Sequence, residues 1–155
     1  MKNLFISGIT GKVGKLLSSY ALESNHFKLV GGSCSPDNNF FGKDVGELLE
    51  IDEIGIQISE KMSEDLSVDI IIDFSSPKSS MKILQLAKIK EIPILIGTTG
   101  FSEDDFKEIE IASTQIPVLF APNTSSGIAI LKNILNKSKN LFSEDNEFSI
   151  SETHH

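Results

Sequence analysis

The N-terminal segment places three glycines between a short apolar run and an amphipathic stretch. The apolar run covers residues 4–6, and the glycines follow at positions 8, 11 and 14. Apolar residues then recur at helical spacing from Val13 to Ala21, which predicts a helix. A strand, a glycine turn and a helix in this order form the structural context of a dinucleotide fingerprint. The chain is therefore expected to begin as an α/β fold with a phosphate-binding turn.

Each glycine has a separate expected role. Gly8 permits the tight turn, Gly11 lets the backbone approach a pyrophosphate, and Gly14 lets the helix pack closely on the sheet. Thr10 stands where the commoner G-x-G-x-x-G pattern has its middle glycine. The anion would bind free N–H groups at the helix N-terminus. The motif alone leaves open a second interpretation, an ordinary glycine-rich turn that binds no ligand.

Further apolar runs alternate with helical patterns along the chain. The runs cover residues 29–30, 68–74, 92–96 and 116–120, and they are typical of strands buried on both faces of a parallel sheet. The alternation predicts an α/β fold with a Rossmann-like doubly wound parallel sheet.

Three helices are expected in the second half of the chain. Met81, Leu84 and Ala87 mark one of them, Ser102 begins another, and apolar residues from 128 to 142 trace a long third helix. Residues 35–59 are the least regular stretch, and we expect them to form a surface excursion.

Composition narrows the class of protein. A chain of 155 residues can form one domain with a real core. No apolar stretch is long enough to span a bilayer, and the first residues do not resemble a signal peptide, so we expect a cytoplasmic protein. The single cysteine, Cys34, agrees with a reducing compartment, and we interpret it as a small buried residue rather than a catalytic thiol. The net charge of −8 argues against nucleic-acid and anionic-membrane partners.

Polar and glycine-rich loops follow three of the predicted strands. They cover residues 73–77, 97–101 and 121–127. Ligands of open parallel sheets bind outside the carboxyl ends of the strands, where these loops would lie. Each loop could be ordinary turn chemistry, but three of them together with the glycine turn favour a nucleotide site.

Six segments in order form a specific pattern. They are GITGKVG at 8–14, GKDVGEL at 42–48, DFS at 73–75, GTTGF at 97–101, APNTSSG at 121–127 and ETHH at 152–155. Over the whole chain the pattern resembles the bacterial dihydrodipicolinate reductase family, also called 4-hydroxy-tetrahydrodipicolinate reductases. Its most specific parts are the GTTGF loop and the ETHH ending. Members of that family use NADPH or NADH to reduce 4-hydroxy-tetrahydrodipicolinate, a cyclic imine dicarboxylate, to tetrahydrodipicolinate on the diaminopimelate route to lysine.

The resemblance also implies roles for individual residues. The pyrophosphate would bind Gly8, Ile9, Thr10, Gly11, Lys12 and Val13. The nicotinamide side would be lined by Gly97, Thr98, Thr99, Ala121, Pro122, Asn123 and Thr124. His154 would donate or accept the proton and His155 would contact the substrate. The resemblance implies no metal ligand.

The histidine pair suits this chemistry. A hydride that arrives at one carbon requires a proton or hydrogen bond at the adjacent nitrogen, and histidine can supply it near neutral pH. The alternative interpretation is that the pair begins a purification tag or belongs to a frayed terminus.

The end of the second strand bears on the choice of cofactor. Cys34 and Ser35, at the position expected beside the adenosine ribose, provide no carboxylate for its 2′-hydroxyl. Small uncharged groups do not repel a 2′-phosphate, so we expect NADPH to be accepted at least as well as NADH. Lys12 is the one nearby cation that the sequence suggests.

The family pattern extends beyond this chain. Family members continue past the histidine pair with a lysine, a Pro-Ser-Gly-Thr loop and a sheet domain that also forms a tetramer. We therefore expect residues 1–126 to form the dinucleotide-binding domain, and residues 127–155 the connecting helix and first strand of a truncated substrate domain. Activity of this short chain is expected to be impaired. The alternative is a non-catalytic NAD(P)-binding module or fragment, and the oligomeric state of this chain is left open.

Overall fold

The computed structural model of the chain describes residues 1–138. The chain divides into a compact unit, Met1–Pro122, and a second unit that starts at Asn123. The boundary predicted from the sequence is residue 126, and the assignment of residues 127–155 to a second domain stays a prediction.

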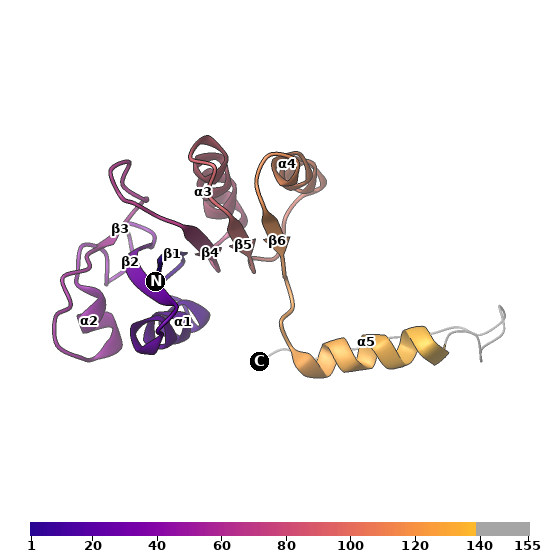
Figure 1. The fold of residues 1–155 in the computed structure, drawn as a ribbon, viewed down its shortest axis with the longest axis horizontal. Coiled ribbons are helices and arrows are strands. Elements are labelled where there is room, and N and C mark those ends of the chain that lie inside the picture. Colours follow the sequence, from indigo (N-terminus) through magenta and orange to yellow (C-terminus); the bar gives the residue numbers. More distant parts are fainter. Residues whose placement is uncertain (139–155) are drawn as a thin grey trace. The chain divides into compact units, whose positions relative to one another are not determined.

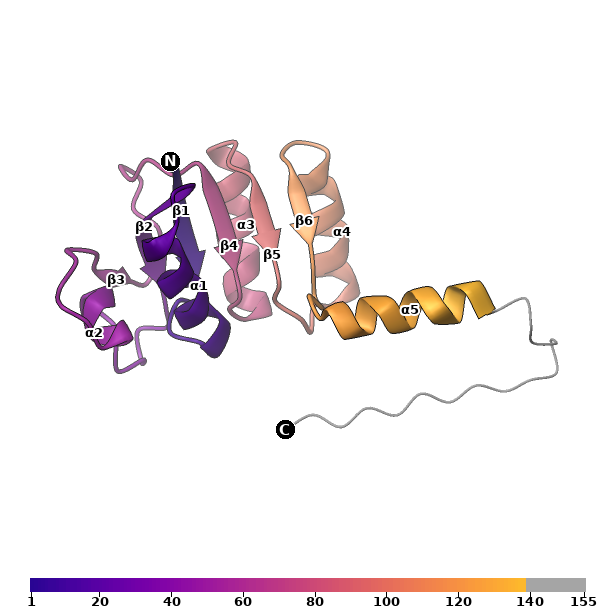
Figure 2. The same ribbon diagram turned by 60° about the horizontal axis from the view of Figure 1, so that its bottom comes forward.

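The first unit is built on a six-stranded sheet with the order β3-β2-β1-β4-β5-β6, in which every strand pairing is parallel. The strands are β1 (Lys2–Ser7), β2 (Phe27–Ser33), β3 (Ile58–Ser59), β4 (Ile70–Asp73), β5 (Ile94–Ile96) and β6 (Val118–Phe120). Figure 2 shows them side by side. The chain runs outward from β1 to β3, then crosses back to β4 and runs outward to β6. This order confirms the doubly wound α/β fold and places the topological switch point between β1 and β4.

Helices cover both faces of this sheet. They are α1 (Lys12–Glu23), α2 (Val45–Leu49), α3 (Pro77–Ile89) and α4 (Glu103–Ser113). Helices α1 and α2 lie on one face, and α3 and α4 lie on the other (Figure 1). The side chains of β1 alternate between the two hydrophobic clusters: Leu4 and Ile6 belong to the cluster under α1 and α2, and Phe5 to the cluster under α3 and α4. Burial on both faces explains why β1 reads as a continuous apolar run.

Side-chain caps define the starts of α3 and α4. The Ser76 hydroxyl accepts a hydrogen bond from the Ser79 N–H, and Pro77 follows at the first helical position. Helix α4 begins with a capping box formed by Ser102 and Asp105, which confirms the predicted start at Ser102.

The expectation that residues 35–59 form a surface excursion is only partly right, because residues 35–44 and 49–57 are exposed or half-buried but the stretch also contributes to the core. This stretch contains α2 and β3, and Val45, Leu48 and Ile58 are buried in the cluster under α1 and α2. The Asp44 carboxylate holds α2 in place by accepting hydrogen bonds from the N–H groups of Gly46 and Ile54 at 2.7 and 2.9 Å. A helix of five residues and a strand of two are too short to produce a recognisable period in the sequence.

The second unit contains the helix α5 (Ser126–Ser138), which agrees with the predicted long helix as far as residue 138. The predicted continuation to Phe142 and the strand before Glu152 lie outside the described residues. None of the helices within residues 1–138 combines the length and the apolar character needed to cross a membrane.

Two glycines allow the turn between β1 and α1 to pack closely. Gly8 has a φ of +78°, and a Cβ atom there would lie 2.2 Å from the Phe74 carbonyl oxygen. A Cβ atom on Gly14 would lie 2.3 Å from the Gly8 carbonyl oxygen. Because the obstructing atoms are backbone, no side-chain rotation can relieve either contact.

We therefore expect Gly14→Ala to lower the free energy of unfolding by more than about 2 kcal/mol, although alanine is the better helix former by about 1 kcal/mol. Urea denaturation measures the difference. Gly127→Ala is the control, because the added methyl group in α5 meets only the Ser125 hydroxyl at 3.7 Å and should be neutral or slightly stabilising. Wild-type stability in Gly14→Ala would show that α1 can move away from the turn at little cost.

Candidate functional site

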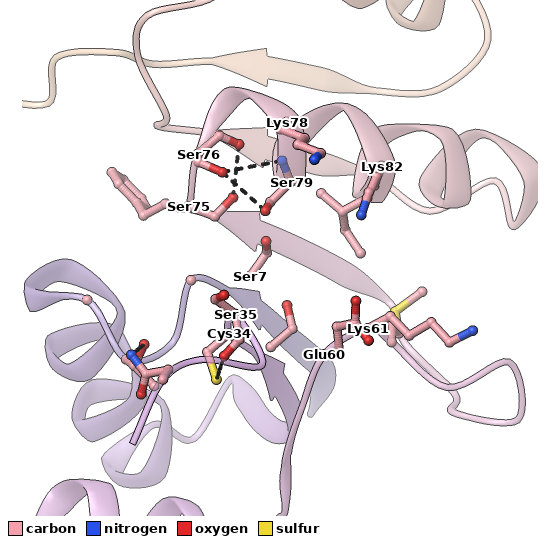
Figure 3. Close-up of a pocket in the computed structure, with 18 of the residues that line it drawn as sticks. Ser7, Cys34, Ser35, Glu60, Lys61, Ser75, Ser76, Lys78, Ser79 and Lys82 are labelled. Atoms are coloured by element: carbon pink, nitrogen blue, oxygen red, sulfur yellow. Dashed lines mark hydrogen bonds between the residues drawn. The ribbon is translucent and has the colours of Figure 1, made fainter. Parts of the chain in front are cut away.

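A cavity of ≈ 730 Å³ lies at the carboxyl ends of β1, β2 and β4 (Figure 3). The strand register brings these ends level, since Ser7 of β1 lies opposite Ser33 of β2 and Asp73 of β4. The lining residues are Ser7, Gly8, Thr10, Gly11, Ser33, Cys34, Ser35, Pro36, Asn38, Glu60, Lys61, Met62, Phe74, Ser75, Ser76, Lys78, Ser79, Lys82, Ile83 and Leu86. This volume is in the usual range of small-molecule sites, and the position at the switch point is where open α/β sheets bind ligands.

The glycine turn brings an uncapped helix end to this cavity. Gly11 is the N-cap of α1 and provides no side-chain hydrogen bond. The N–H groups of Gly8 and Ile9 both donate to the Ser33 carbonyl, at 2.9 and 3.1 Å, and the N–H of Gly11 donates to the Gly8 carbonyl. The first N–H groups of α1, from Lys12 onward, have no intrahelical acceptor. They are the donors that an anion would use.

The charges around the start of α1 also favour an anion. Its first turn contains no acidic residue and begins with Lys12. Helix α4, in contrast, has acidic residues at 103–105 that compensate its dipole. The positive end of α1 is therefore left without a negative partner in its own first turn.

Two of the predicted pyrophosphate residues have additional structural roles. The Ile9 side chain is fully buried in the hydrophobic cluster under α1 and does not line the cavity. The Thr10 hydroxyl accepts a hydrogen bond from the Asn38 side-chain amide at 3.2 Å, so that it connects the turn to the loop after β2. Lys12 and Val13 are exposed and do not line the cavity.

The end of β2 forms an uncharged wall of the cavity. Cys34 and Ser35 both line it, and the Cys34 thiol donates a hydrogen bond to the Ser35 carbonyl at 3.3 Å. Burial raises the pKa of the Cys34 thiol above its ordinary value, which favours the neutral form at pH 7. The side chain is half-buried, and not fully buried as the sequence suggested. A neutral thiol is a weak nucleophile.

Asp73, at the end of β4, is fully buried and accepts hydrogen bonds from three hydroxyl groups. Ser75 donates to Oδ1 at 2.6 Å, Thr98 donates to Oδ2 at 2.7 Å, and Ser80 of α3 also donates to Oδ2. The Thr98 hydroxyl in turn accepts from the Ser75 N–H at 2.9 Å. This network, which we call the Asp73 cluster, holds together the loop after β4, the loop after β5 and the first turns of α3.

The structure separates the residues predicted on the nicotinamide side. Thr98 is 5 % exposed and belongs to the Asp73 cluster, whereas Thr99 is exposed. A Cβ atom on Gly97 would lie 2.1 Å from the Phe74 ring, so a larger residue there would require the ring to move. Ala121 donates its N–H to the Ile96 carbonyl at 2.8 Å, and Pro122 is exposed. None of these residues lines the cavity.

The remaining predicted residues lie beyond the first unit. Asn123 and Thr124 are exposed, and the Asn123 side-chain oxygen accepts a hydrogen bond from the Ser125 N–H at 2.9 Å. His154 and His155 lie outside the described residues. The assignments to the nicotinamide and to the substrate stay predictions.

Three lysines of the cavity were not predicted from the sequence. Lys61 follows β3, and Lys78 and Lys82 lie on α3. The four-residue spacing of Lys78 and Lys82 on a predicted helix indicates a shared face. Nothing in the sequence showed that this face turns toward the end of β2.

Comparisons with known proteins point to one family. A family model described as "Dihydrodipicolinate reductase, N-terminus" matches residues 2–124. Proteins named 4-hydroxy-tetrahydrodipicolinate reductase from Buchnera aphidicola subsp. Baizongia pistaciae and Colwellia psychrerythraea are 31% and 33% identical, over 99% and 97% of this chain. These matches cover 57% and 56% of the two relatives, so the chain spans a little over half of their length.

Solved structures support the fold. A dipicolinate-bound dihydrodipicolinate reductase from Paenisporosarcina sp. TG-14 matches with a TM-score of 0.72 and 18% identity, over 92% of this chain and 55% of that one. An aspartate semialdehyde dehydrogenase with NADP from Candida albicans matches with a TM-score of 0.58 and 13% identity, over 88% of this chain and 47% of that one.

Thr98 and Thr99 are adjacent, but Thr98 belongs to the Asp73 cluster and Thr99 is exposed. Thr98→Val removes one hydrogen bond to Asp73 and leaves the Ser75 N–H without its acceptor, so we expect the free energy of unfolding to fall by about 1–3 kcal/mol. Thr99→Val makes the same change at an exposed position and should stay within about 0.5 kcal/mol of wild type. Urea denaturation of both variants is the measurement. Equal stability of the two variants would contradict the role given to Thr98.

Proposed function

Because this chain belongs to the dihydrodipicolinate reductase family, we propose that it provides the NAD(P)H-binding part of an enzyme that reduces 4-hydroxy-tetrahydrodipicolinate. The observation that carries the proposal is the uncapped start of α1, which meets a cavity of ≈ 730 Å³ at the switch point of the sheet. A bound nicotinamide cofactor would supply the hydride for the reduction.

The residues of the turn fit a pyrophosphate. Gly11 carries no side chain on the approach to α1, and Lys12 and Val13 present the first N–H groups of the helix. Gly8 and Ile9 contribute by shaping the turn, since their N–H groups are bonded to Ser33. Thr10 lines the cavity beside them. The turn can therefore bind an anion with backbone N–H groups, and Lys12 adds a positive charge in the same first turn of the helix.

The adenosine and nicotinamide halves of the cofactor would extend in opposite directions from this turn. The adenosine ribose is proposed to lie beside Cys34 and Ser35, which border the same cavity as Gly8 and Gly11. The nicotinamide is proposed to lie toward Gly97–Thr99 and Ala121–Thr124, as the family resemblance implies. The Asp73 cluster then acts beneath the loop after β5, where it fixes Thr98.

The proton chemistry is assigned to the histidine pair. His154 is proposed to exchange a proton with the substrate nitrogen beside the carbon that receives the hydride, and His155 to contact the dicarboxylate. Both residues lie outside the described part of the chain, and their assignment rests on the family resemblance. The slow turnover expected of the isolated 155 residues also stays a prediction.

Gly11→Val tests the phosphate-binding turn. The added side chain would occupy the approach to α1, and we expect the affinity for NADPH and NADH to fall at least about tenfold, or about 1.4 kcal/mol. Fluorescence titration gives the dissociation constants, and circular dichroism verifies the fold. Ser19→Val is the control, because it places the same side chain on the exposed surface of α1. Unchanged affinity in a folded Gly11→Val variant would exclude this turn as the pyrophosphate site.

His154→Ala tests the proton-transfer role. We expect kcat for NADPH oxidation with freshly prepared substrate to fall by about 100-fold to 10,000-fold relative to the slow turnover of the unmodified chain, while the affinity for NADPH stays unchanged. His26→Ala is the control, since His26 is exposed in the turn before β2. An undiminished kcat in His154→Ala would support the alternative that the pair is a tag or a frayed end.

A further inference from the structure

The residues that line the cavity have a net positive charge, whereas the chain as a whole has a net negative charge. The chain has a net charge of −8, yet the charged residues that line the cavity are three lysines, at positions 61, 78 and 82, and one glutamate, at position 60. An acidic protein repels anionic ligands over most of its surface. A local excess of positive charge therefore indicates a place where an anionic group can bind.

Two of these lysines share one face of α3. Lys78 and Lys82 are four residues apart and therefore lie one above the other on the helix surface. Figure 3 shows both on α3, across the cavity from Cys34 and Ser35 at the end of β2. Within residues 1–138, neither ammonium group forms a hydrogen bond or a salt bridge.

The opposite wall of the cavity determines which part of a dinucleotide these lysines face. Cys34 and Ser35 border the cavity at the end of β2, where the adenosine ribose of a dinucleotide lies in folds of this type. The pyrophosphate belongs at the glycine turn, where the N–H groups of α1 are free. The anion left for the face of α3 is one attached to the adenosine half.

We propose that Lys78 and Lys82 bind the 2′-phosphate of NADPH and give this site a preference for NADPH over NADH. The proposal rests on the proposed function, because it assumes that the cavity holds the adenosine half of the cofactor. The hydroxyl groups of Ser35 and Ser79, which line the same cavity, can donate further hydrogen bonds to the phosphate. In this proposal the preference for NADPH comes from two lysines of α3, and not from a basic residue directly after β2.

Glu60 is the competing group. It lines the cavity beside Lys61, and a carboxylate at this point could accept a hydrogen bond from the 2′-hydroxyl of NADH and repel a 2′-phosphate. The proposal requires that the α3 lysines outweigh this single negative charge.

The test compares two double variants with the same loss of charge. Lys78→Gln combined with Lys82→Gln removes the cationic face, and Lys28→Gln combined with Lys88→Gln removes two lysines that do not line the cavity. Titration calorimetry measures the binding of NADPH, NADH, 2′,5′-ADP and 5′-AMP. Thermal melting verifies that both double variants are folded.

We expect the wild-type chain to bind NADPH more tightly than NADH, and 2′,5′-ADP more tightly than 5′-AMP. In the Lys78/Lys82 variant the affinities for NADPH and 2′,5′-ADP should fall at least about tenfold, which corresponds to about 1.4 kcal/mol. The affinities for NADH and 5′-AMP should stay within about twofold, a difference of about 0.4 kcal/mol. The Lys28/Lys88 variant should resemble wild type for all four ligands.

Every other outcome contradicts the proposal, and the outcomes differ in what they show about the lysines. Equal losses for NADPH and NADH would show that the lysines serve the pyrophosphate, and no loss would show that they are merely solvated. A wild-type preference for NADH would assign the ribose contact to Glu60. Binding of neither dinucleotide by wild type would refute the proposed function itself, and this inference with it.

Discussion

Three backbone segments meet at Gly8 with no side chain between them. A Cβ atom there would lie 2.2 Å from the Phe74 carbonyl oxygen, and a Cβ atom on Gly14 would lie 2.3 Å from the Gly8 carbonyl oxygen. The end of β1, the start of α1 and the loop after β4 are therefore held at backbone contact distance. Helices α1 and α3 both begin at the carboxyl edge of the sheet but lie on opposite faces of it (Figure 1). Their first turns therefore diverge, and the cavity lies between them, beside this contact.

The Asp73 cluster provides the second layer of organisation. A carboxylate buried without a basic partner needs hydrogen bonds to compensate its lost hydration, and Ser75, Ser80 and Thr98 provide them. The same bonds tie the loops after β4 and β5 to α3. The helix that carries Lys78 and Lys82 is therefore positioned by a polar network as well as by its apolar face.

The parts of the structure with a strong local signal were predictable from the sequence. The glycines at 8, 11 and 14 and the long apolar runs predicted the sheet and its first turn, and Ser102 predicted the start of α4. The elements α2 and β3 were not predictable, because they are too short for a hydrophobic period and their burial depends on tertiary packing. The lysines of α3 show the same limit: their spacing is local, but the wall opposite them is built by β2, far away in the sequence.

The open start of α1 connects the folding of this chain to its surroundings. A helix with glycine as its N-cap, as Gly11 is for α1, is less stable than one with a capping side chain by only about a few tenths of a kcal/mol. An anion that binds there can act as the missing cap. A ligand that binds only the folded chain stabilises it by about 2.7 kcal/mol when its concentration is a hundred times its dissociation constant. Under the proposed function, the free energy of unfolding, and with it the resistance to proteolysis, would therefore rise with the concentration of the nucleotide.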